Sequence, residues 1–143
     1  MNLKQVQALL TEMSKTLNLH VNAYSVTGSA VMLAHGLRQE VSNINLLVNW
    51  HGASVLNVAG LEMQYCTIKG LMVAQYGCIT FALDAKGVDN AVLTPAFTAK
   101  GTSIEDLLAI KINSPLKKDI EDARALQPFV IGKKTAILGK ASI

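Results

Sequence analysis

Two short segments of the sequence carry residue types that could handle a phosphorylated ligand. Gly28-Ser29 follows an apolar run, and Asn43-Ile44-Asn45 begins fifteen residues after Gly28. A glycine at a turn between a strand and a helix lets the backbone approach a ligand closely. The free N–H groups at a helix start, together with the serine hydroxyl, suit a phosphate. On its own, a Gly-Ser pair before a helix is also an ordinary turn and cap.

The two asparagines stand one residue apart, where side-chain oxygens could reach a metal ion. Mg²⁺ is a hard cation that dehydrates reluctantly and prefers anionic oxygen ligands. An asparagine carbonyl can ligate such an ion, but it brings no charge. Asp84 ends the apolar run 79–83 and is a candidate for an acidic ligand, although a turn residue would also fit there.

Hydrophobic periodicity predicts the elements that would position the Gly-Ser pair. Apolar residues recur at helical spacing over residues 2–18, which predicts an amphipathic helix with one buried face. Residues 21–26 are rich in β-formers and predict a strand. The chain then turns into a short helix over residues 30–35, which Gly36 ends.

The middle of the chain is rich in predicted strands. The apolar run 44–48 has the length of a central strand covered on both faces, and residues 50–52 close it. Residues 53–59 are ambiguous and fit a short helix. Further strands are predicted over residues 61–69, 71–75 and 78–83.

Two helix starts are visible in the last third. Thr102 and Glu105 have the spacing of a capping box. Ser114-Pro115 offers a capping hydroxyl and a proline at the first helical position, and Pro128 is predicted to end that helix. Residues 131–143 carry no clear assignment. The order of elements predicts an α+β fold, with a mixed β-sheet and helices packed mainly on one face.

The same segments, taken in order, resemble the nucleotidyltransferase superfamily, in particular small bacterial members of the abortive-infection and toxin–antitoxin type. Those families combine a Gly-Ser turn, an apolar helix ending in His-Gly, an arginine and an Asp-x-Asp strand. Later helices carry a lysine and a Lys-Asp-x-x-Asp motif. The matching segments are residues 26–38, 42–48, 103–111 and 118–126. The resemblance covers roughly residues 24 to 126 and implies a single nucleotidyltransferase-like domain over residues 1–143.

The resemblance implies a role for each matching position. Gly28, Ser29 and Arg38 would contact ATP or another nucleotide. Asn43, Asn45 and Asp84 would occupy the Mg²⁺ positions. Asp84, Lys111 and Asp119 would be the catalytic or phosphate-handling residues. Both members of the expected Asp-x-Asp pair are asparagine, so the implied Mg²⁺ binding is weak or absent.

Three interpretations of Asn43 and Asn45 stay open. The chain is a degenerate homologue, a pseudoenzyme that binds nucleotide or phosphate without catalysis. Alternatively it is an active metal-dependent nucleotidyltransferase whose metal site has been altered or engineered. In the third interpretation the likeness lies in the fold alone, and the protein is a non-enzymatic dimeric interaction module.

Composition narrows the classes of partner. Only 16% of the residues are charged, against about 25% in typical soluble domains, which predicts that some apolar surface lies in a homodimer or other homo-oligomer. The net charge of +3 and the 5% aromatic content give no indication of nucleic acid binding. No membrane span or signal peptide is predicted, and Cys66 and Cys78 are expected to be buried, inert thiols in a cytoplasmic protein.

Overall fold

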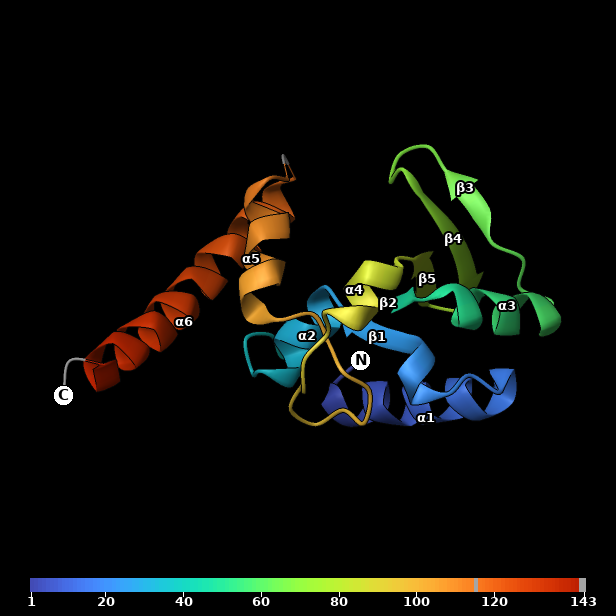
Figure 1. Cartoon of the computed structure of the whole chain (residues 1–143), viewed down its shortest axis with the longest axis horizontal. Coiled ribbons are helices and arrows are strands. Elements are labelled where there is room, and N and C mark those ends of the chain that lie inside the picture. Colours follow the sequence, from blue (N-terminus) through green and yellow to red (C-terminus); the bar gives the residue numbers. More distant parts are fainter. Residues whose placement is uncertain (115, 142–143) are drawn as a thin grey trace. The chain divides into compact units, whose positions relative to one another are not determined.

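A five-stranded mixed sheet forms the centre of the N-terminal part of the chain. The computed structural model describes residues 1–114 and 116–141, and side chains as far as Val130. These residues divide into two compact units, Met1–Thr102 and the residues from Ser103 onward. In sheet order the strands are β1 (Tyr24–Thr27), β2 (Ile44–Val48), β5 (Ile79–Leu83), β4 (Leu71–Tyr76) and β3 (Gln64–Cys66) (Figure 1). β2 and β5 run parallel, and the other neighbouring strands are antiparallel.

The two faces of this sheet differ in polarity. Side chains alternate between the faces of a strand, and Ile44, Leu46 and Val48 of β2 are fully buried on one face. On the other face, register places four polar side chains in one row across four strands. These are Thr27, Asn45, Thr80 and Gln75. On the other face of β2, Asn45 and Leu47 are only half-buried, so the strand is completely covered on one face. The prediction of a strand covered on both faces is wrong.

Four helices accompany the sheet in the N-terminal unit. They are α1 (Leu3–Leu17), α2 (Ser29–Ala34), α3 (Trp50–Val58) and α4 (Ala85–Asp89). α1 is amphipathic as predicted, begins with a capping box at Asn2 and ends at Asn18, which is left-handed with φ of 56°. Its buried face includes Leu10 and Met13. α3 packs on the apolar face, where a Cβ added at Gly52 would lie only 3.0 Å from the Cβ of Val48. The predicted α+β fold is confirmed.

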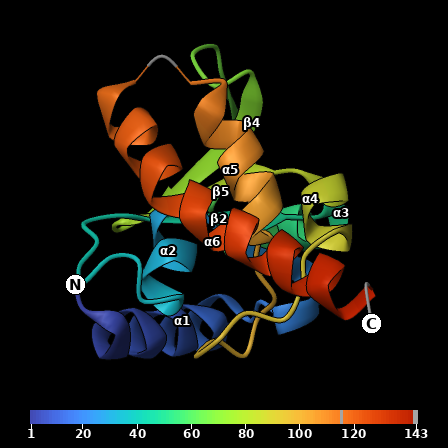
Figure 2. The ribbon, with the colours of Figure 1, turned by 90° about the vertical axis from the view of Figure 1, so that its left-hand side faces the viewer.

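The second unit consists of two packed helices, α5 (Ile104–Ile112) and α6 (Lys117–Ala141) (Figure 2). The cap of α5 lies one residue later than predicted, since the Ser103 hydroxyl accepts from the Asp106 N–H. Thr102 instead donates its hydroxyl to Thr27, 2.8 Å away. The prediction that Pro128 ends the second helix is wrong, because α6 continues through Pro128 to Ala141. A proline inside a helix removes one backbone donor and crowds the carbonyl four residues earlier, which usually kinks or ends the helix. Pro115 lies outside the described residues.

Several other boundaries differ from the prediction. The expected strand over residues 21–26 begins as a 3-10 turn, Val21–Ala23, and residues 50–52 start α3 where they were expected to close a strand. Cys66 and Cys78 are both partly exposed, and Cys78 lies in the turn between β4 and β5, so the prediction of two buried strand thiols is wrong. Within residues 1–114 and 116–141, no helix has the length and apolarity needed to cross a bilayer.

Candidate functional site

The turn at Gly28 connects β1 to α2. Gly28 has φ of 66° and ψ of −140°, a backbone conformation that L residues rarely adopt, and it is the N-cap of α2. Its carbonyl accepts from Val31, 3.1 Å away, which starts the helix. Ser29 is the first helical residue and is half-buried. Val31 thus uses its N–H on Gly28, and the N–H groups of Ser29 and Ala30 are those of the first turn that have no partner within the helix and can meet an anion.

Gly28 lies directly against the side chain of Asn45. A Cβ added at Gly28 would be 3.4 Å from Asn45 Nδ2, and the preceding residue, Thr27, is the register partner of Asn45. Asn43 is exposed and stands just before β2. The structure therefore brings the Gly-Ser turn and the Asn-x-Asn segment to one place, at the start of β2.

Asp84 is not brought to this place. The register partner of Asn45 on β5 is Thr80, and Asp84 follows the opposite end of β5, four residues or about 13 Å farther along. Asp84 is instead the N-cap of α4, where its Oδ1 accepts from Gly87, 2.9 Å away. This geometry argues against Asp84 as the third member of a metal site with Asn43 and Asn45.

Thr80 occupies the position that the prediction assigned to Asp84. Its side chain is on the same face as Asn45, and its hydroxyl donates to Gln75 Oε1, 2.8 Å away. Among the described residues, no group of three or more His, Cys, Asp or Glu side chains is placed to hold a metal ion. The donors beside Gly28 are thus neutral amides and hydroxyls.

Arg38 lies in the segment between α2 and β2 and is half-buried. It belongs to the same unit as Gly28 and Asn45. Arg38 thus lies on the connection between these two residues, and its contact with a nucleotide stays a prediction.

Lys111 and Asp119, the other predicted site residues, form a buried ionic cluster inside the second unit. Lys111 Nζ lies 3.1 Å from Asp119 Oδ1 and 2.8 Å from Asp122 Oδ2. Lys111 is 7% exposed and Asp122 is 5% exposed. The Ser114 hydroxyl donates to Asp119 Oδ2, 2.6 Å away. That hydrogen bond is the largest of the causes that lower the pKa of Asp119, and Lys111 adds to it.

Asp122 is the member of this cluster to which the sequence analysis assigned no role. The signals for it were its place as the second acid of the Lys-Asp-x-x-Asp match and its spacing of three residues from Asp119, which places both carboxylates on one side of a helix. The contacts show that Lys111 and Asp119 neutralise each other and join α5 to α6. This structural role is sufficient to explain why both are present.

Comparison with known proteins gives a likeness at the level of structure. Neither the protein-family models nor the curated proteins contain a match. The solution structure of the antibiotic-resistance factor ANT(2'')-Ia, an aminoglycoside nucleotidyltransferase, has a TM-score of 0.56 and 15% identity, over 99% of this chain and 92% of that one. The crystal structure of ANT(2'')-Ia in complex with adenylyl-2''-tobramycin has a TM-score of 0.52 and 15% identity, over 97% and 95% of the two chains. The chain therefore has a nucleotidyltransferase-type fold.

Proposed function

We propose that this protein is a catalytically impaired member of the nucleotidyltransferase fold, which binds a nucleotide or another phosphate-bearing small molecule. The observation that carries the proposal is the neutral row formed by Thr27, Asn45 and Thr80 beside Gly28. The turn keeps the features that suit a phosphate, while the strands next to it lack the carboxylates that would hold a metal ion.

The chemistry of nucleotidyl transfer explains why this difference matters. Transfer depends on positioning and on neutralising charge at the phosphate, and bound metal ions supply much of both. Mg²⁺ is bound in proteins mainly through carboxylates and substrate phosphates. Asn43, Asn45 and Thr80 offer oxygen atoms without charge, so this donor set does not fit Mg²⁺. No step of the proposed function passes through a metal ion.

The turn itself can still bind an anion. Gly28 has no side chain between the backbone and a ligand, and Ser29 contributes a hydroxyl at the start of α2. Backbone N–H groups and a hydroxyl bind phosphate without needing a cation. The proposed binding of nucleotide is therefore independent of Mg²⁺.

Calorimetric titration with ATP, with and without Mg²⁺, tests the proposal. We expect similar affinity in both conditions and a clear loss of affinity in Ser29→Ala and Gly28→Val. Ser54→Ala is a matched control, because Ser54 is an exposed serine whose hydroxyl donates to a backbone carbonyl of α3. Mg²⁺-dependent turnover of labelled nucleotide would overturn the proposal and make the protein an active transferase with an altered metal site.

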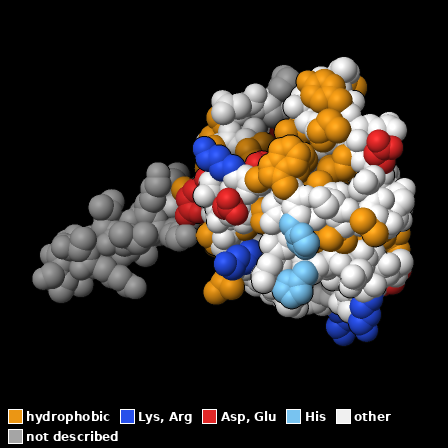
Figure 3. Space-filling view, turned by 45° about the vertical axis from the view of Figure 1, so that its right-hand side comes forward, with side chains coloured by type: hydrophobic (Ala, Val, Ile, Leu, Met, Phe, Trp, Pro, Cys, Tyr) orange, Lys and Arg blue, Asp and Glu red, His pale blue; other side chains and the backbone are white. Residues whose placement is uncertain are grey.

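An interaction role is the second candidate, and the exposed apolar residues favour it. Large apolar side chains are exposed on α3 and on the β3–β4 hairpin, and Figure 3 shows hydrophobic side chains gathered on this side of the molecule. The exposed apolar residues of these two elements are Trp50, Val58, Tyr65, Ile68 and Leu71. Ile68 is 96% exposed, and patches of this kind mark contact surfaces.

A second copy of the chain is the proposed occupant of this surface, as the low charge content predicts. Light scattering should report a dimer that Ile68→Glu weakens, while Lys69→Glu, at the neighbouring exposed position, serves as the control. A monomer at all concentrations would remove this candidate. A cytoplasmic location and a toxin–antitoxin setting stay predictions from the sequence.

A further inference from the structure

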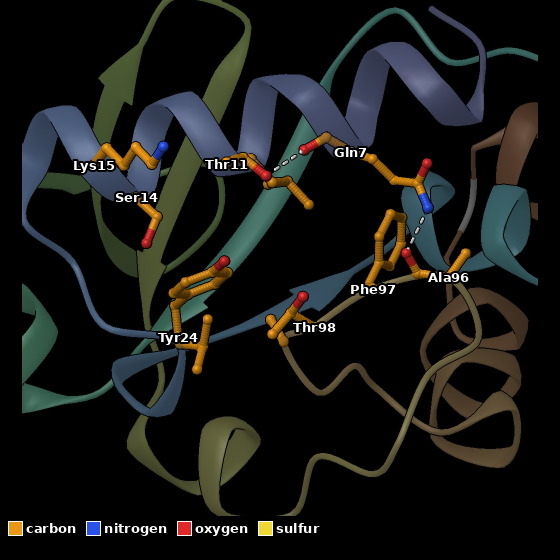
Figure 4. A pocket seen from close by; sticks show the side chains of 11 residues that line it. Gln7, Thr11, Ser14, Lys15, Tyr24, Ala96, Phe97 and Thr98 are labelled. Carbon is orange, nitrogen blue, oxygen red and sulfur yellow. Dashed lines mark hydrogen bonds between the residues drawn. The ribbon is translucent and has the colours of Figure 1, made fainter.

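A cavity lies on the apolar side of the sheet, away from the Gly28 turn. It is enclosed by α1, by the start of β1 and by the segment 96–99, and it has a volume of about 380 Å³ (Figure 4). Tyr24 lines it from the face of β1 opposite to Thr27 and Ser25, since side chains alternate along a strand. The cavity and the polar row at Asn45 are therefore on different faces of the sheet.

The walls of the cavity divide into an apolar part and a polar part. Leu10, Val21 and Phe97 supply apolar surface. Lys15, Tyr24 and Thr98 supply polar groups. A volume of several hundred Å³ that combines apolar surface with placed polar groups is compatible with a site for a small molecule.

The hydrogen bonds of the polar lining leave acceptor oxygens on Gln7, Thr11 and Ser14 and donors on three other residues. Thr11 and Ser14 use their hydroxyl hydrogens on the backbone carbonyls of Gln7 and Leu19, and the Gln7 amide donates to the Ala96 carbonyl, 2.6 Å away. Among the described residues, the hydroxyls of Tyr24 and Thr98 and the Lys15 ammonium donate no hydrogen bond to a protein acceptor. These donors call for an acceptor from outside the chain.

Tyr24 is the most specific of these donors. The residue is 4% exposed, and Figure 4 shows its hydroxyl directed into the cavity. Burial raises the pKa of Tyr24, so the phenol stays protonated and can donate at neutral pH. A buried tyrosine hydroxyl usually finds a hydrogen-bond partner, and here the space in front of it is open to a ligand.

The charge of the lining selects an anion. Lys15 is the one charged side chain among the residues that line this cavity. Glu12, the acidic residue on the adjacent part of α1, accepts instead from the hydroxyls of Tyr76 and Thr16, each 3.0 Å away. Lys15 therefore faces the cavity rim without a neutralising carboxylate among the described residues.

We propose that this cavity binds a small organic carboxylate with an aromatic or branched apolar body. The carboxylate accepts from Tyr24, Lys15 and Thr98, and the apolar body packs against Leu10, Val21 and Phe97. A single cation at the rim fits one negative charge and not the several charges of a nucleoside triphosphate. The inference does not rest on the proposed nucleotide site, which lies on the other face of the sheet.

Fluorine NMR with para-fluorobenzoate as the probe tests the site. We expect saturable binding, accompanied by amide shifts in residues 14–24 and 96–99, and no displacement by ATP. The neutral isostere para-fluorobenzamide should bind about tenfold more weakly, because charge-assisted hydrogen bonds are roughly twice as strong as neutral ones.

Two variants and one control locate the binding. Lys15→Met and Tyr24→Phe should each weaken para-fluorobenzoate severalfold, whereas Lys4→Met, an exposed lysine on the same helix outside the cavity, should leave it unchanged. Lys15 is exposed, so its replacement leaves the core intact even if Tyr24→Phe alters folding. Equal binding of the acid by wild type and both variants, or no saturable binding at millimolar probe, would overturn the proposal.

Discussion

Gly28 and Asn45 are in contact: a Cβ added at Gly28 would lie 3.4 Å from the Nδ2 of Asn45. The turn that suits a phosphate and the strand expected to carry metal ligands are thus two sides of one site. A change at either residue is therefore expected to affect the other, so a variant at each residue needs its own control.

Replacing Gly28 by alanine should destabilise the protein by about 1–3 kcal/mol, the range for residues held in sparsely populated backbone conformations. The φ of 66° with ψ of −140° strains any L residue, while the new methyl group would lie at an ordinary van der Waals distance, 3.4 Å, from Asn45 Nδ2. Urea unfolding measures the change. Gly77→Ala is the control, because Gly77 also has positive φ, 58°, but open space around it. If both variants lose the same stability, the contact with Asn45 adds nothing.

Placing acids at positions 43, 45 and 80 should create Mg²⁺ binding, which we propose is weak or absent in the present chain. The variant Asn43→Asp, Asn45→Asp, Thr80→Asp places three carboxylates at the start of β2 and β5. Without metal, like charges on neighbouring strands should lower stability by about 0.2–1 kcal/mol per pair. Added Mg²⁺ should raise the Tm of this variant and leave the wild type unchanged.

The controls for this variant separate Thr80 from Asp84. The double change Asn43→Asp, Asn45→Asp retains Asp84, so equal Mg²⁺ stabilisation of the double and triple variants would show that position 80 adds no ligand and would leave Asp84 as a candidate. Asn22→Asp, Asn57→Asp changes two exposed asparagines elsewhere and should not respond to Mg²⁺. A triple variant that ignores Mg²⁺ would contradict the assignment of this site.

The difference between Thr80 and Asp84 shows where prediction from the sequence ends. The run of residues 78–83 predicts a strand, and a strand followed by Asp84 suggests an acid at its end. Which residue of that strand faces Asn45 depends on pairing and register, which one sequence does not specify. Residue type alone favours Asp84 as the third metal ligand. The register instead pairs Asn45 with the neutral Thr80.

Local signals were more successful where the physics is local. The periodicity of residues 2–18 and the Gly-Ser turn predicted α1 and α2 almost to the residue. The cap of α5 was displaced by one residue because Thr102 finds a partner distant in sequence, Thr27, and leaves the cap to Ser103. Such tertiary competition is invisible to a pattern that considers only neighbours along the chain.

Replacing Lys111 by methionine should destabilise the second unit by about 3 kcal/mol, because it removes the cation that the buried Asp122 and the half-buried Asp119 share. Loss of helical circular dichroism in urea measures this change. Lys117→Met, an exposed lysine at the start of α6, should have little effect. A Lys111→Met protein of unchanged stability that loses ATP affinity would instead assign Lys111 to phosphate handling.

Ser114→Ala should reduce the dependence of stability on acid pH. The Ser114 hydroxyl is the largest cause of the lowered pKa of Asp119. A lowered carboxyl pKa in the folded state adds stability above the unfolded value, near 3.8, and this contribution is lost as the pH falls through the folded pKa. Removing the hydroxyl moves the pKa of Asp119 back toward 3.8, so less stability is lost on acidification.

The free energy of unfolding at about pH 6 and about pH 3 measures this effect, and the difference between wild type and variant removes the titration of other acids. At the higher pH, Ser114→Ala should cost about 1 kcal/mol, the usual net value of one hydrogen bond. At the lower pH, below the unfolded value of 3.8, the two proteins should be closer in stability, because the contribution of the lowered pKa of Asp119 is being lost there. Ser54→Ala, whose hydroxyl contacts a carbonyl and no carboxylate, should follow the wild type at both pH values. A constant difference between Ser114→Ala and wild type would show that the hydroxyl stabilises α6 without acting on the charge of Asp119.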